Sequence, residues 1–177
     1  MYKIKATVKG LSPLRHNKFV EARATSGMSK KKSPENITDE TFERAYYDKA
    51  EGFYIPRNAL KKVICEGGKK VKIGRGSAST LFKAILILEQ DKFYIGTQDY
   101  KIYKEAVRIP PRTGGRIMQQ WIINENWEVT FEALILDDVI PSDAILESIK
   151  YAGLYYGLLD GRPEFGRFEL ISFEKLK

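Results

Sequence analysis

The last quarter of the chain constrains the fold more than any other segment, because it reads as a helix, a glycine- and arginine-rich loop and a closing strand. Apolar residues at helical spacing follow Pro141, namely Ile145, Leu146, Ile149, Ala152 and Gly153. The loop contains Gly157, Gly161, Arg162, Gly166 and Arg167. Glycine lets the backbone approach a ligand closely, and arginine suits phosphate. The loop therefore predicts either an anion-binding segment or a tight connection with solvated arginines.

Hydrophobic periodicity predicts the other elements. Alternation over residues 2–8 predicts a strand with one apolar and one basic face. A helix is expected from Pro56 to about Gly67, because proline is tolerated in the first turn and the Gly67-Gly68 pair ends the pattern. A short helix is expected from Thr38, an extended piece at 53–55 and a basic loop at 69–79. A buried central strand is expected at 81–88, and residues 93–95 are either its hairpin partner or a short excursion. A hairpin at 107–117 and strands at 127–135 and about 168–173 complete the expectations.

The order of these elements predicts an α+β fold. Strand, helix, strand, strand, helix, strand is the ferredoxin-like (RRM-like) βαββαβ arrangement, with helices on one face of the sheet. We expect one domain spanning residues 1–177, with loop or hairpin insertions at about 15–50 and 97–120. The first strand would lie centrally and direct Lys3, Lys5 and Lys9 toward the open face. A solvated lysine face is the alternative interpretation.

The charge balance favours an acidic partner. The 177 residues carry a net charge of +7, with a pI near 9.3, and this favours nucleic acid before a membrane surface. The basic residues form short clusters at 30–32, 61–62, 69–75 and 108–116. Lysine-rich thermophilic proteins reach a similar balance for other reasons, so charge alone does not decide the function.

Several site classes lack the residues they need. Cys65 and His16 are the only residues of their kinds, so neither a disulfide framework nor a thiolate or His-based metal site is expected, and no cofactor is predicted. Gly161 to Gly166 has the spacing of a phosphate loop but continues into Arg-Phe and a strand, so it is not one. The N-terminus lacks a signal peptide and no apolar run reaches membrane-spanning length, which predicts a cytoplasmic protein.

Two short motifs carry a family resemblance. Tyr54-Ile-Pro56 followed by Leu60-Lys61 enters the first long helix, and Gly161-Arg-Pro-Glu-Phe-Gly-Arg-Phe168 enters the last strand. Together they resemble the RAMP (repeat-associated mysterious protein) superfamily, above all the backbone subunit of CRISPR effector complexes. The chain departs from the family in one place, since Arg57-Asn58-Ala59 replaces a Gly-Ser-Ser.

The resemblance implies that the first helix and the glycine-rich loop bind guide RNA and that copies polymerise along it, as part of antiviral defence. It also implies a β-hairpin thumb, for which residues 105–118 are the candidate. The residues expected to contact nucleic acid are Lys61, Lys62, Lys69, Lys70, Arg75, Arg108, Arg112, Arg116, Gly161, Arg162, Gly166 and Arg167.

The sequence thus predicts a non-catalytic module that binds single-stranded RNA, with single-stranded DNA as the other candidate ligand. Its protein partners would be copies of itself or other effector subunits. A RAMP-type RNA endonuclease is the first alternative, and His16, Asp39 and Asp48 are its candidate catalytic residues. The second alternative is a virus-encoded protein–protein module that mimics a backbone subunit and interferes with effector assembly.

Overall fold

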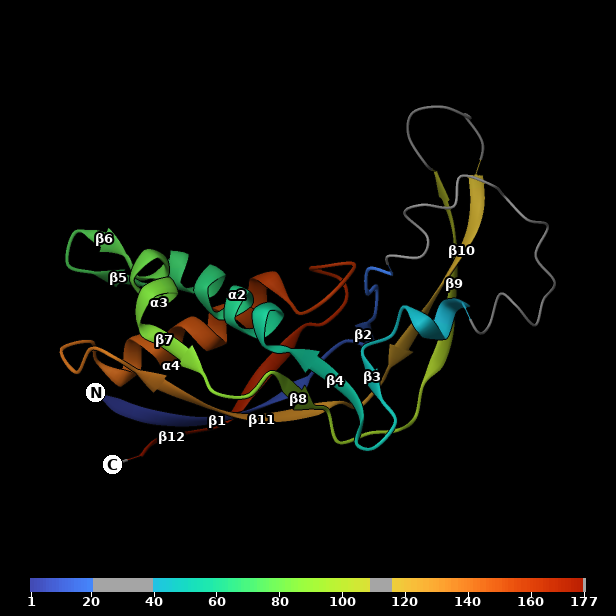
Figure 1. Cartoon of the computed structure of the whole chain (residues 1–177). Coiled ribbons are helices and arrows are strands. Elements are labelled where there is room, and N and C mark those ends of the chain that lie inside the picture. The colour runs from blue at the N-terminus through green and yellow to red at the C-terminus, as the bar shows by residue number, and fades with distance from the viewer. Residues whose placement is uncertain (21–39, 109–115, 177) are drawn as a thin grey trace.

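A four-stranded antiparallel sheet organises the molecule (Figure 1), for which the computed structural model describes residues 1–20, 40–108 and 116–176. The strands are β1 (Tyr2–Gly10), β7 (Leu86–Leu88), β11 (Glu128–Ile135) and β12 (Phe168–Leu176). Their order in the sheet is β12-β1-β11-β7, so β1 is central, as predicted. The predicted strands at 2–8, 127–135 and 168–173 are confirmed.

Helices cover one face of this sheet and leave the other open (Figure 1). They are α2 (Arg57–Gly67), α3 (Ala78–Ile85) and α4 (Ser142–Tyr151), which continues as the π-helical turn η3 (Ala152–Tyr156). The apolar stripe of α2 faces inward, with Leu60, Val63 and Ile64 almost fully buried. Pro56 lies at the N-cap rather than inside the first turn, and α2 ends at Gly67 as expected.

Alternation along the central strands separates the core from the open face. Ile4 pairs with Ala133 and Ala6 with Phe131, and all four side chains are buried beneath the helices. The intervening Lys5 pairs with Glu132 on the other face. Because side chains alternate along a strand, this single register buries one set and exposes the other.

The run at 81–88 is not the buried central strand that its apolar composition predicts. It forms the end of α3 and then the three-residue edge strand β7. The Ser77 side chain accepts a hydrogen bond from the backbone N–H of Ser79, which starts α3, and Phe82 fills the core. A short apolar run is compatible with a buried strand or a buried helix. Here the packing of Phe82 in the core favours the helix.

The segment at 69–79 is also more regular than the predicted loop. It contains the 3-10 turn η2 (Gly68–Lys70) and a small hairpin of β5 (Lys72–Ile73) and β6 (Gly76–Ser77). The short helix expected from Thr38 is described only at residues 40–43, and β3 (Tyr47–Asp48) follows soon after it.

Two smaller three-stranded sheets accompany the main one. One sheet joins β3, β4 (Gly52–Pro56) and β8 (Lys92–Tyr94), and this confirms the predicted extended pieces. The other joins β2 (Leu14–Arg15), β10 (Arg116–Asn124) and β9 (Lys101–Arg108). The predicted hairpin therefore has a longer stem than expected, while its tip, residues 109–115, lies outside the described residues. No helix within 1–20, 40–108 or 116–176 is long and apolar enough to cross a bilayer.

Candidate nucleic-acid interface

Three neighbouring hollows of about 330, 230 and 540 Å³ lie beside α2. Lys62 lines the first and second hollows, Arg162 the second and third, and Glu66 the first and third. We call them together the basic groove, whose cationic lining residues are Arg15, Lys61, Lys62, Lys69, Lys83 and Arg162.

The four lysines of the basic groove have no acidic partner among the residues that the structure describes. Among the described residues, no ion pair is recorded for Lys61, Lys62, Lys69 or Lys83. Glu66 is committed to Arg162, whose Nη1 lies 2.9 Å from its Oε2. Unpaired cations along a groove attract a polyanion, because binding exchanges counterions for fixed charges.

The glycines of the C-terminal loop are explained by contacts within the protein. Gly166 has φ of +73°, and a Cβ there would lie 2.0 Å from the backbone oxygen of Leu158. Leu158 N–H in turn donates to the oxygen of Gly166 at 2.9 Å. A Cβ on Gly161 would lie 2.6 Å from the Arg15 guanidinium. At these glycines the backbone approaches protein atoms, as the tight-connection interpretation expects.

The loop arginines have different settings. Arg162 lines two hollows of the basic groove and reaches Glu66 on α2. Arg167 instead donates from Nε to the backbone oxygen of Pro163 at 2.8 Å, within the loop itself. Arg162 is therefore the loop side chain best placed to meet a ligand in the groove.

Arg15, which the sequence analysis did not single out, holds this loop against the hairpin stem. Its guanidinium carbon lies 4.5 Å from the Trp121 ring centroid and 4.6 Å from that of Phe165. Its Nη2 lies 2.9 Å from Asp160 Oδ2. Stacking between two aromatic rings suits a planar guanidinium. Arg15 belongs to the two-residue strand β2, which is too short to show a periodic pattern in the sequence. No local signal therefore pointed to this arginine.

The other predicted contacts do not form one site. Lys69 and Lys70 lie beside the tyrosines of η3, whereas Arg75 lies in the β5–β6 turn. Arg108 pairs with Arg116 across the β9–β10 stem, at the opposite end of the molecule from β5 and β6 (Figure 1). Arg112 lies outside the described residues. The structure thus brings Lys61, Lys62, Lys69 and Arg162 together, and leaves the hairpin arginines apart.

His16 lies in the core with both ring nitrogens bonded. Asn124 uses its Nδ2 to donate to Asp99 O at 2.8 Å, so its Oδ1 accepts from His16 Nε2 at 2.6 Å. His16 Nδ1 accepts from the backbone N–H of Tyr46 at 3.1 Å. Burial lowers the pKa of His16 to about 4, against a smaller opposing effect of the Asn124 hydrogen bond. This neutral histidine serves as a structural link.

Asp48, one of the two aspartates proposed for a nuclease, is engaged by a lysine. Asp48 pairs with Lys92 and accepts from the backbone N–H of Ala50 at 3.0 Å, and the Lys92 contact lowers its pKa. Asp39 lies outside the described residues. Within the described residues, no group of three or more His, Cys, Asp or Glu side chains is arranged to hold a metal ion.

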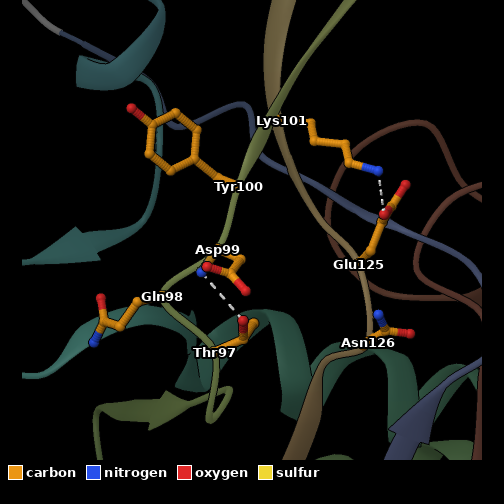
Figure 2. A pocket seen from close by; sticks show the side chains of 7 residues that line it. All are labelled: Thr97, Gln98, Asp99, Tyr100, Lys101, Glu125 and Asn126. Carbon is orange, nitrogen blue, oxygen red and sulfur yellow. Dashed lines mark hydrogen bonds and ion pairs between the residues drawn. The ribbon is translucent and has the colours of Figure 1, made fainter.

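A second, polar pocket of about 490 Å³ lies where the hairpin stem meets the domain (Figure 2). Its lining includes Tyr100, Asn126 and the ion pair between Lys101 Nζ and Glu125 Oε2, at 2.6 Å. Asp99 N–H donates to Thr97 Oγ1 at 3.2 Å. The pocket shares no lining residue with the basic groove, and its one lysine is paired.

The open face of the sheet carries lysines that are matched by glutamates. Lys3 Nζ lies 2.8 Å from Glu89 Oε1, and Lys5 Nζ lies 3.7 Å from Glu132 Oε1. The contact with Glu89 raises the pKa of Lys3. Lys9 lies opposite Glu128 on one neighbouring strand and Glu169 on the other. The basic face expected from the first strand thus has glutamates beside each of its three lysines.

The fold has a counterpart among solved structures. No protein-family model matches the sequence, and neither does any curated protein. The structure is similar to a chain in the cryo-EM structure of the type III-B Cmr-beta bound to cognate target RNA, with a TM-score of 0.57 and 11% sequence identity. The match covers 99% of this chain and 61% of the other, so this chain spans about three fifths of that chain's length.

Proposed function

We propose that this protein is a non-catalytic module that binds single-stranded RNA, built on a ferredoxin-like domain of the RAMP type. The order β1-α2-β7-β11-α4-β12, the sheet order β12-β1-β11-β7 and the likeness to the Cmr-beta chain support this fold assignment. The domain would span residues 1–177, with insertions at about 15–50 and 97–120.

The basic groove is the observation that carries the proposal. Its lysines, which have no ion pair among the described residues, and Arg162 would supply phosphate contacts in neighbouring hollows beside α2. Such contacts are independent of base sequence, so the proposed binding is sequence-tolerant. The buried, neutral His16 supports a binding role over a catalytic one, because both of its ring nitrogens are already bonded.

Salt dependence tests the binding. If the groove neutralises about five phosphates, the slope of log K on log salt for single-stranded RNA is expected near −3.5, from roughly −0.7 per contact. Fluorescence anisotropy of a labelled RNA across a salt series measures it. A slope near zero contradicts the proposal, and so does an affinity for an uncharged polymer that equals the affinity for RNA. The same titration with single-stranded DNA shows whether the sugar matters.

The β9–β10 hairpin is proposed as an arm that contacts a neighbouring copy on the same strand. A domain this small covers few nucleotides, so neighbouring copies would supply much of the affinity. We expect larger particles on longer RNAs, and loss of that trend when residues 108–116 are replaced by a short Gly-Ser turn. Light scattering after size exclusion measures the mass. One fixed mass on all RNA lengths instead favours a stand-alone or inhibitory module.

A further inference from the structure

The π-helical turn η3 presents an aromatic side chain to solvent. Tyr155 is 51% exposed and lies in the turn that connects α4 to the glycine-rich loop. Nothing in the core requires an aromatic residue there, since the neighbouring Tyr156 packs against the core and Tyr155 does not. An exposed ring of this size has an available surface for a ligand.

Two kinds of contact hold the Tyr155 ring in place. Tyr151, one helical turn earlier, stacks on it with ring centroids 6.0 Å apart and an interplanar angle of 26°. Lys70 Nζ lies 5.5 Å from its centroid, and Lys69 Nζ lies 5.8 Å from the centroid of Tyr156. The tyrosines are therefore flanked by two cations that have no recorded carboxylate partner among the described residues.

Tyr155 and Arg162 line the same hollow of the basic groove, at about 540 Å³. A volume of that order lies within the range that accommodates a small organic ligand. A nucleotide entering it meets the Tyr155 ring and Arg162, which is paired with Glu66. Lys69 and Lys70 lie beside the tyrosines and not in the lining of this hollow. Base and phosphate are the two chemical groups that this combination suits.

We propose that Tyr155 is a stacking site for an unpaired nucleobase of the bound strand, and that Lys69, Lys70 and Arg162 hold the adjacent phosphates. This inference rests on the proposed function and adds to it a specific contact with a base. Every base has a π-face, so the site does not select a sequence. A base that stacks on the ring displaces the Lys70 ammonium, which is then free to pair with phosphate.

Ring removal at two matched positions tests the site. Tyr155→Leu is compared with Tyr155→Phe, which keeps the ring, and with Tyr100→Leu, which removes a ring of similar exposure, 47%, from the pocket in Figure 2. On short oligouridine, Tyr155→Leu is expected to weaken binding about tenfold, because stacking contributes roughly 1–3 kcal/mol per base. Tyr155→Phe and Tyr100→Leu are expected to bind as the unmodified protein does.

An abasic sugar–phosphate oligomer of the same length separates base from phosphate. The unmodified protein and Tyr155→Leu are expected to bind it equally, since no base is present to stack. If all variants bind oligouridine equally, the base site is wrong and the proposed function stands. If Tyr155→Leu loses affinity for both polymers, the ring supports the groove rather than a base. If the unmodified protein binds neither polymer, both proposals fail.

Discussion

The two faces of the four-stranded sheet both carry lysines, but the lysines have opposite surroundings. On the open face, Lys3 and Lys5 pair with Glu89 and Glu132. On the helical side, Lys61, Lys62 and Lys83 line the basic groove, and no ion pair is recorded for them among the described residues. The excess positive charge is therefore displayed by the helices and their loops.

The difference follows from how each face is built. In an antiparallel sheet, residues directly opposite each other lie on the same face within contact distance, so Lys5 meets Glu132 on the neighbouring strand. Lys3 reaches Glu89, which follows the edge strand β7. A helix that packs one stripe on a core leaves its other side to solvent, and its charges meet only what neighbouring loops supply. The same residue type is thus paired with glutamate on one face and available to the proposed RNA ligand on the other.

The largest expected effect concerns the backbone of the loop. Gly166→Val places a Cβ 2.0 Å from Leu158 O at a φ of +73°. We expect a loss of about 3 kcal/mol or more in unfolding free energy, from left-handed strain and overpacking. Gly74→Ala, at φ +60° with nothing within 4 Å, is the control and should cost about 1 kcal/mol. Thermal melts compare them, and equal losses would contradict the packing account.

Acidification is expected to destabilise the protein through His16. Its pKa is about 4 when folded, against an ordinary 6.5, so the unfolded chain binds the proton more tightly. The contribution of neutral His16 to the unfolding free energy is up to about 3 kcal/mol. It is fully present above pH 6.5 and is lost as the pH falls toward 4. Urea unfolding at a series of pH values measures it. The fall in unfolding free energy between pH 6.5 and 4 should be smaller in His16→Gln than in the unmodified protein. If this variant has the same pH dependence as the unmodified protein, His16 is not its source.

Neutralising three lysines on either face compares the faces directly. Lys61, Lys62 and Lys83, each changed to Gln, should weaken RNA binding about 30-fold and make the salt slope shallower by about 2. The matched variant changes Lys3, Lys5 and Lys9 to Gln, which removes the same charge from the open face. We expect it to change affinity less than about twofold. Equal losses in the two variants would mean that net charge, and not the groove, controls binding.

The loop arginines should have a smaller effect. Arg162→Ala with Arg167→Ala is expected to weaken RNA binding about tenfold and to make the slope shallower by roughly 0.7 to 1.4. Because Arg167 is bonded to Pro163 O within the loop, the single variant Arg162→Ala should account for most of the loss. Anisotropy titrations separate the two residues, and unchanged binding in a folded double variant would remove the loop from the interface.

The smallest expected effect is a gain. Glu89→Gln with Glu132→Gln removes the ion-pair partners of Lys3 and Lys5 on the open face, where Glu174 still lies opposite Lys5. RNA binding at low salt should then strengthen by about two- to threefold, while stability changes by less than about 1 kcal/mol, as expected for exposed pairs. No gain in affinity would show that the open face fails to bind RNA for reasons other than charge matching.

Local patterns were sufficient for much of the fold. Alternation in residues 2–8 and 127–135 predicted two central strands, and the stripe of Leu60, Val63 and Ile64 predicted α2. These signals are short-range, because strand and helix periodicity depends on residues a few positions apart. The run at 81–88 failed for the same reason, since continuous apolar residues carry no period and only the packing of Phe82 identifies α3.

The candidate site could be predicted only in part. Lys61, Lys62, Lys69 and Arg162 were identified as basic residues near helix and loop signals, and the structure brings them into one groove. Lys83 was missed because it was assigned to a strand. Tyr155 was missed because its exposure depends on the π-helical end of α4, although the Tyr155-Tyr156 pair before Gly157 is a visible signal.

Periodicity and composition established most of the regular elements, their order and the excess of basic residues. Folding established which lysines are paired with glutamate, that Gly161 makes room for Arg15, and that His16 is a buried link to Asn124, 108 residues away. The physical reason is the range of each interaction. Backbone preference and periodicity act within a few residues, whereas burial, charge pairing and pKa depend on neighbours that only folding brings together.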